Sequence, residues 1–191
     1  MKCIVITKKQ LMLAICLVLS LSFIVLGSVS VFANTNRLLP IYCVETEKKQ
    51  IAISFDAAWG NDDTEQLITI LKEYNVPATF FVVGAWVDKY PESVKQLSDA
   101  GHQIQNHSNT HPHMPQLSKA QMINEIESCN KKIESITGKC PTLLRPPYGD
   151  YDNALIEVMN DLKMYTIQWD VEPYATVGNP HKYWSCETSE R

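Results

Sequence analysis

Two hydrophobic periods alternate along the chain from Gln50 onward. Short apolar runs rich in β-branched residues predict buried strands, whereas apolar residues spaced three and four apart predict helices with one inner face. The strand pattern occurs at residues 50–55, 78–83, 102–105, 142–144 and 164–171. The helical pattern lies between these runs, at residues 62–74, 91–100, 118–137 and 152–162.

This strand–helix alternation predicts an α/β fold with parallel strands and helices outside, in a barrel or an open sheet. Five strands are fewer than a closed barrel of this kind contains, so a barrel would be partial. In either arrangement the carboxyl ends of the strands gather on one face. The residues that fall at or just past such ends are Asp56, His107, Arg145 and Asp170.

The N-terminus has a different pattern. Lys2, Lys8 and Lys9 precede a nearly uncharged apolar run at residues 11–33, so an N-terminal apolar helix is expected. A basic start followed by an apolar run is typical of an export signal, but this run is also long enough to span a bilayer. Residues 1–33 are therefore predicted to be a cleaved signal peptide or a membrane anchor, followed by a linker at residues 34–48. Both alternatives place the rest of the chain outside the cytoplasm.

Composition adds two limits. The chain has 191 residues, which suits one domain, and a net charge of −4, which gives no reason to expect nucleic acid as a partner. Outside the export segment the cysteines are Cys43, Cys129, Cys140 and Cys186, without any CxxC spacing. A cysteine zinc site is therefore not expected, and separate thiols or one bridge are.

His107 and His111 are four residues apart and directly follow a predicted strand. Two neutral imidazoles are ligands that a zinc-class cation prefers. Such a pair alone is more often surface or core histidine, but here acidic residues follow another strand end. Of these, Asp62 or Asp63 caps the next helix and the other is a plausible oxygen ligand, with Asp63 favoured.

The segment Arg145–Gly149 reads Arg-Pro-Pro-Tyr-Gly. Its two prolines fix the backbone and keep it out of helix, which would leave the Tyr148 N–H free to face a cleft. Arg145 would hold the Asp56 carboxylate if both emerge on one face. The alternatives are an ordinary loop here and a turn-capping role for Asp56.

Taken together and in this order, four segments resemble the motifs of the polysaccharide deacetylases of carbohydrate esterase family 4, the NodB-homology domain. The resemblance runs from about Lys49 to Glu172. The four segments are Ser54–Asp56, His107–His111, Arg145–Gly149 and Trp169–Glu172. It implies a distorted (β/α) barrel, here partial with about five strands, and an N-deacetylase of peptidoglycan, chitin or a related polymer.

The resemblance also implies roles. Asp56 would be the general base, braced by Arg145, and both histidines would bind a divalent metal, with zinc the expected ion. The Tyr148 N–H would help to bind the oxyanion. Glu172 stands where the family usually has an aspartate that pairs with the arginine.

Two departures limit the expected activity. Ala57 stands where the family usually has a second, metal-binding aspartate, so Asp63, Asp62 or water would have to complete the metal site. The family's fifth motif, which carries a general-acid histidine, is not found; residues 49–172 are expected to be an incomplete domain and residues 173–191 a divergent tail. We therefore expect a weak or inactive deacetylase. The rival hypothesis is a non-catalytic remnant that binds metal or glycan.

Overall fold

The computed structural model describes residues 8–9, 12–13, 15–17 and 36–171. The chain divides into two units, Met1–Arg37 and Leu38–Arg191. In the first unit the described residues 8–9, 12–13 and 15–17 are helical and exposed. Within the described ranges, no helix has both the length and the hydropathy to cross a bilayer. Most of the predicted signal or anchor segment lies outside those ranges, so its nature stays a prediction.

The second unit is built on five parallel strands, whose order across the sheet follows the order along the chain. These strands are β1 (Ser54–Ala57), β2 (Thr79–Val82), β3 (Gln103–Asn106), β4 (Leu143–Leu144) and β5 (Tyr165–Thr166). Each strand returns through a helical connection, as expected for parallel pairs. The predicted α/β class with a partial, five-stranded barrel is confirmed.

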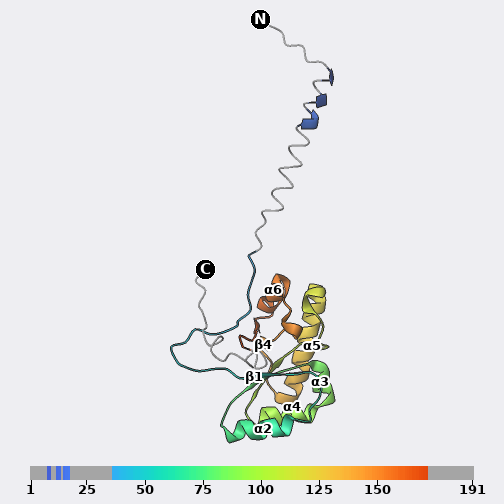
Figure 1. Ribbon diagram of the computed structural model, residues 1–191. Helices are drawn as coiled ribbons and strands as arrows, with labels where there is room; N and C mark the ends of the chain where they lie inside the picture. The colour runs from blue at the N-terminus through green and yellow to red at the C-terminus, as the bar shows by residue number, and fades with distance from the viewer. Residues whose placement is uncertain (1–7, 10–11, 14, 18–35, 172–191) are drawn as a thin grey trace. The chain divides into compact units, whose positions relative to one another are not determined.

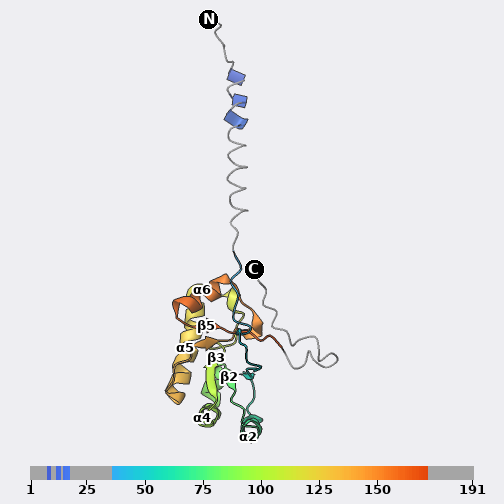
Figure 2. The ribbon, with the colours of Figure 1, turned by 90° about the vertical axis from the view of Figure 1, so that its left-hand side faces the viewer.

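The helices flank this sheet. They are α2 (Thr64–Glu73), α3 (Gly84–Lys89), α4 (Pro91–Asp99), α5 (Lys119–Thr137) and α6 (Asn153–Asp161), with single 3₁₀ turns η1 (Met114–Gln116) and η2 (Pro147–Gly149). In two views at right angles, α5 lies beside the central strands, with α2 and α4 toward one end of the unit and α6 toward the other (Figures 1 and 2).

The sequence pattern did not predict α3. It has only six residues and begins at a glycine, too short to show a helical period. The chain leaves the helical region at Tyr90, where φ is −132° and ψ is 55°, because Pro91 disfavours helical backbone in the residue before it. This break separates α3 from α4.

Helix α5 is the longest, and its ends are encoded locally. Ser118 forms a capping box with Gln121, and Gly138 ends the helix with a φ of 69°. Its inner face buries Met122, Ile126 and Ile133 against the sheet and neighbouring helices. Two apolar clusters result, one beneath α2 to α4 and one between α5, α6 and η1. Together they hold the carboxyl ends of the strands in place.

Part of the predicted linker lies against the sheet. The Ile41 N–H donates to the Thr166 carbonyl at 2.8 Å, and the Gln168 N–H donates to the Ile41 carbonyl at 2.9 Å. Ile41 also forms a parallel bridge with Ile167. Leu38 is fixed by a backbone N–H donated to Asn153 Oδ1 at 2.8 Å. The segment around Ile41 therefore covers the outer edge of β5.

Candidate active site

Three polar residues converge where the parallel strands end. Asp56 is the third residue of β1, His107 directly follows β3, and Arg145 directly follows β4. The register of β1 to β3 aligns Asp56 with Phe81 and Gln105, one residue short of the end of each strand. The sheet thus collects residues that are far apart in sequence at one edge, where folds of this class place their chemistry.

Arg145 and Asp56 form a direct ion pair. Arg145 Nη1 donates to Asp56 Oδ1 at 2.8 Å, and Nη2 donates to Ser54 Oγ at 2.7 Å. The guanidinium carbon lies 4.1 Å from the centre of the Phe81 ring, and the arginine side chain is 6% exposed against 34% for Asp56. The buried Arg145 guanidinium therefore orients the Asp56 carboxylate through Oδ1, and Oδ2 lies toward His107.

His107 is prepared as a neutral ligand. Its Nδ1 lies 2.7 Å from the Arg145 carbonyl oxygen, which can only accept, so we assign the ring proton to Nδ1. The lone pair of Nε2 is then free, 3.9 Å from Asp56 Oδ2. Burial is the main cause that lowers the pKa of His107, and it outweighs the nearby Asp56 charge. A neutral imidazole with one nitrogen tied to a carbonyl is the form that binds metals.

His111 provides the second imidazole. Its ring centre is 5.0 Å from that of His107, and burial lowers its pKa as well. Its Nδ1 is buried and has no hydrogen-bond partner among the described residues. An unsatisfied buried nitrogen is costly unless something else binds it. Both histidines therefore fit a metal ion.

A carboxylate ligand is less well provided. Either Asp62 or Asp63 was expected to cap α2. Asp63 is its N-cap residue, but the Asp63 side chain makes no capping hydrogen bond. Asp56, Asp62 and Asp63 line one cleft of about 490 Å³ together with Ala57. The described residues nevertheless contain no group of three His, Cys, Asp or Glu side chains arranged to hold a metal. The residues present therefore fit a metal bound by two imidazoles, and Asp63 as a ligand stays a prediction.

The loop that carries the histidines is held by α5. The Glu125 carboxylate accepts three hydrogen bonds, from Asn109 N at 2.9 Å, Thr110 N at 2.8 Å and Thr110 Oγ1 at 2.9 Å. Ser108 and His111 have φ values of 65° and 63°, in the left-handed region that non-glycine residues rarely adopt. The sequence analysis did not identify Glu125. Only its position, beside the apolar face of the predicted helix that follows the histidine pair, could have indicated a contact with this loop.

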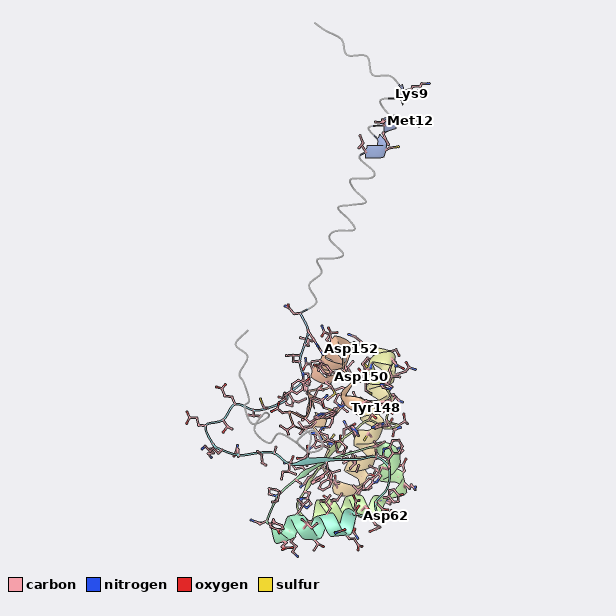
Figure 3. All side chains as sticks on the ribbon, in the orientation of Figure 1. Lys9, Met12, Asp62, Tyr148, Asp150 and Asp152 are labelled. Carbon is pink, nitrogen blue, oxygen red and sulfur yellow. The ribbon has the colours of Figure 1, made fainter. Side chains whose placement is uncertain are left out.

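Tyr148 lies next to the histidines. Its φ of 61° is also left-handed, and its ring centre is 4.6 Å from that of His111 and 4.2 Å from that of His113. Figure 3 shows Tyr148 and Asp150 near each other, whereas Asp62 lies at the start of α2. The structure thus brings Tyr148 to the metal-ligand candidates, while the role of its N–H stays a prediction.

The tryptophans differ in burial. Trp86 is 3% exposed and its indole N–H donates to the Gly60 carbonyl at 2.8 Å, so it is core. Trp59 is 77% exposed, with its ring centre 5.7 Å from that of His111. Trp169 is half-buried, 6.0 Å from the Arg145 guanidinium. Glu172 and residues 173–191 lie outside the described residues, so the role of Glu172 stays a prediction.

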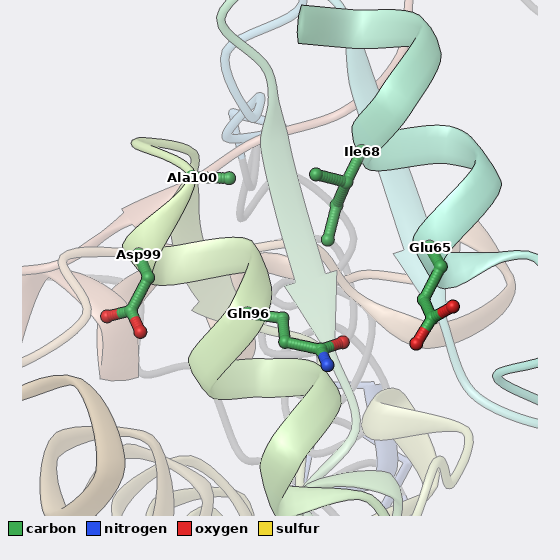
Figure 4. Close-up of a pocket in the computed structure, with 5 residues that line it drawn as sticks. All are labelled: Glu65, Ile68, Gln96, Asp99 and Ala100. Atoms are coloured by element: carbon green, nitrogen blue, oxygen red, sulfur yellow. The ribbon is translucent and has the colours of Figure 1, made fainter.

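A second hollow, of about 470 Å³, lies between α2 and α4 (Figure 4). Its lining residues are Glu65, Ile68, Gln96, Asp99 and Ala100. None of them is a predicted site residue.

The cysteines match the expectation of separate thiols or one bridge. Cys43 is disulfide-bonded, whereas Cys129 and Cys140 are free. Burial raises the pKa of the Cys129 thiol to about 12, so this thiol is unreactive and part of the core.

Comparison with known proteins agrees with this geometry. The profile of the polysaccharide deacetylase family matches residues 44–167. Two curated relatives from Bacillus subtilis are peptidoglycan-N-acetylmuramic acid deacetylases: PdaC, 38% identical over 130 residues, and PdaA, 36% identical over 131 residues. Each match covers 68% of this chain, but 27% of PdaC and 50% of PdaA. The chain thus spans half or less of the length of these relatives.

Solved structures show the same fold. A CE4 family pseudoenzyme from Bacillus anthracis is 34% identical with a TM-score of 0.67, over 70% of this chain and 47% of that one. A mutant of it with restored enzymatic activity is 35% identical with the same TM-score, over 70% and 49%. PdaC itself is 38% identical with a TM-score of 0.60, over 67% and 62%. Similar structures therefore include both an enzyme and a pseudoenzyme.

Proposed function

Since the chain belongs to the polysaccharide deacetylase family, we propose that it is a slow, metal-dependent hydrolase that removes N-acetyl groups from an amino-sugar polymer, peptidoglycan or chitin-like. The observation that supports this most directly is the Asp56 carboxylate, paired with Arg145 and 3.9 Å from the free Nε2 of His107. A base, its orienting cation and a metal-ligand candidate thus share one strand edge. That arrangement suits hydrolysis assisted by a metal.

The metal, with zinc the expected ion, would be held by His107 and His111 and would supply a Lewis acid beside Asp56. Asp56, oriented by Arg145, accepts the proton of the attacking water, and the carbon–nitrogen bond then breaks as the amine nitrogen takes up a proton and acetate leaves. The Tyr148 N–H donates to the oxyanion that forms on the acetyl group. A donor of this kind commonly contributes ~3 kcal/mol to the transition state.

Glu172 is proposed to complete the surroundings of Arg145. Arg145 Nε is buried and has no hydrogen-bond partner among the described residues. A buried charged donor of this kind favours a nearby acceptor. The carboxylate of Glu172, close in sequence to Trp169, would supply one.

Low activity is proposed from Ala57. A methyl group stands where the family usually has a second aspartate, so the metal would have one carboxylate fewer and bind more loosely. This same feature supports a second candidate function, a non-catalytic domain that binds metal or glycan. The similarity to a pseudoenzyme is compatible with it.

We also propose an extracytoplasmic location, with residues 1–33 as signal peptide or anchor. The basic start and apolar run support export, and the disulfide at Cys43 supports an oxidising compartment.

The test is acetate release by the full 191-residue chain, with zinc added, from an N-acetylglucosamine pentamer and from peptidoglycan. We expect slow, zinc-dependent release that falls by about 10²–10⁴-fold in Asp56→Asn, because the general base is lost. Asp99→Asn, an exposed carboxylate on α4, is the matched control and should leave the rate unchanged. Zinc content should fall in His107→Ala and in Asp63→Ala.

Two results would reject catalysis: no acetate at saturating zinc, or equal rates for wild type and Asp56→Asn. Retained zinc or oligosaccharide binding would then favour the non-catalytic alternative. Zinc content unchanged in Asp63→Ala would exclude Asp63 as a ligand.

A further inference from the structure

Four aromatic rings follow one another across the candidate site. From Trp59 to His111 the ring centres are 5.7 Å apart, from His111 to Tyr148 4.6 Å, and from Tyr148 to His113 4.2 Å. The first two contacts are edge-on and the third is stacked with an interplanar angle of 16°. We call these four residues the aromatic row. Within it, His111, a metal-ligand candidate, contacts two exposed rings, those of Trp59 and Tyr148.

The exposure of the row is unusual for such residues. Trp59 is 77% exposed and Tyr148 57% exposed, and the His113 side chain is 46% exposed. Tryptophan is highly buried on average, and this exposed indole lies in the lining of the cleft that contains Asp56, where it is available to a ligand. Trp86, the other tryptophan near this cleft, is buried and hydrogen-bonded, so the exposure of Trp59 is specific to its position.

Two rings of the row, those of His113 and Tyr148, are held by neighbouring groups before any ligand arrives. His113 Nδ1 lies 3.1 Å from Asp150 Oδ2, and its ring rests on that of Tyr148. The backbone of Tyr148 lies within the turn η2, which begins at Pro147 and is preceded by Pro146. Rings that are already ordered lose little conformational freedom on binding, so more of the contact energy remains as affinity.

The chemistry around the row selects its ligand. Carboxylates lie at both ends, with Asp62 and Asp63 in the cleft that Trp59 lines and Asp150 on His113. A flat apolar ring edged by hydrogen-bond acceptors suits a neutral pyranose, whose faces carry C–H groups and whose rim carries hydroxyl donors. An anionic ligand would be repelled by these carboxylates.

We propose that the aromatic row is a binding track for the polymer, on which sugar residues stack on Trp59 to one side of His111 and on Tyr148 and His113 to the other. This inference rests on the proposed function, since it assigns the residues that hold the same N-acetylated polymer. Trp59 would then determine the preference for oligosaccharide length. A long oligomer contacts the row on both sides of His111, whereas a single sugar contacts less of it.

The test is calorimetric binding to the full chain carrying Asp56→Asn, which prevents turnover, with N-acetylglucosamine and its pentamer as probes. We expect the pentamer to bind more tightly than the single sugar. Trp59→Ala should weaken pentamer binding about 10-fold and leave the single sugar unaffected, because one stacking contact is lost. Trp59→Phe should restore most of the affinity.

Tyr74→Ala is the matched control, since Tyr74 is an aromatic residue 70% exposed at the opposite end of α2. Equal pentamer affinity in Trp59→Ala and the parent would overturn the inference, as would self-association that Trp59→Ala abolishes without any binding of sugar. The proposed catalysis is judged separately by acetate release from the chain with Asp56 intact. Pentamer binding that depends on Trp59 without acetate release would uphold the aromatic row and reject catalysis. Acetate release with pentamer binding that does not depend on Trp59 would uphold catalysis and reject the aromatic row.

Discussion

His107 is the residue on which opposing influences meet. Burial lowers its pKa, whereas the Asp56 charge and the Arg145 carbonyl raise it, and burial prevails. The neutral ring is therefore the favoured form in the folded chain near pH 7, which is the state that a metal requires. Desolvation thus favours the protonation state that the proposed metal site needs.

A pH dependence of stability follows for the metal-free protein. Because the pKa of folded His107 lies below the ordinary value of about 6.5, the unfolded chain takes up this proton first as the pH falls. The stability that depends on a neutral His107 is thus fully present above that ordinary pKa and is lost as the pH falls toward the folded pKa. In urea titrations with EDTA, the free energy of unfolding should drop more between pH 7 and pH 5 for wild type than for His107→Gln. Parallel curves for the two proteins would contradict this.

At the scale of elements, α5 acts as a support for the loop that bears the histidines. Glu125 binds two backbone N–H groups and one hydroxyl of that loop. From the other side, a Cβ added at Gly84 would lie 2.4 Å from Asn109 Oδ1, so α3 also packs closely on the loop. These contacts with α5 and α3 support the left-handed backbone of Ser108 and His111.

Glu125→Gln tests this support. Glutamine can keep both backbone N–H bonds through Oε1 and can donate its amide to the Thr110 hydroxyl, but it lacks the negative charge that strengthens these bonds. We expect the free energy of unfolding to fall by about 1–2 kcal/mol, because charge-assisted hydrogen bonds become neutral ones. Zinc affinity should fall by about 10–100-fold, as for groups that orient metal ligands. Glu127→Gln, exposed on the same helix, is the control. Unchanged zinc affinity in Glu125→Gln would show that α5 contributes stability alone.

The elements and the site were not equally predictable from sequence. Helix α5 could be predicted with both ends because Ser118, Gln121 and Gly138 specify them locally. The ion pair of Arg145 with Asp56 could be expected because parallel strands share an edge. Glu125 could not, since its contact with the loop depends on how α5 approaches the sheet. The exposure of Trp59 and burial of Trp86 depend on tertiary packing in the same way.

At the scale of the whole molecule, the N-terminal part of the second unit stabilises the sheet. Residues around Ile41 were expected to be part of a linker, yet Ile41 exchanges two backbone hydrogen bonds with the strand region 166–168. This pairing covers the free edge of β5, an edge that would otherwise be available to another chain. β5 is shorter than predicted because its partner β4 offers only two residues, Leu143 and Leu144, which pair with Tyr165 and Thr166.

Ile41→Pro tests this edge, since proline lacks the N–H that binds the Thr166 carbonyl. We expect the free energy of unfolding in urea to fall by about 1–3 kcal/mol, with faster hydrogen exchange at the Gln168 amide. Val44→Pro, 76% exposed and outside any strand, should change stability by less than about 0.5 kcal/mol. Equal stabilities for the two variants would mean that the covering segment contributes nothing.

The order of the strands across the sheet is the order in which they are synthesised, and this determines when the candidate site can form. The contact between Arg145 and Asp56 joins residues 89 positions apart and spans β1 to β4. Each neighbouring pair of strands can form with a short loop closure, whereas this contact must wait for all four. A partly emerged chain could therefore acquire helices and sheet during translation while its carboxylate and guanidinium remained apart, so the candidate site would be assembled only after most of the fold had formed.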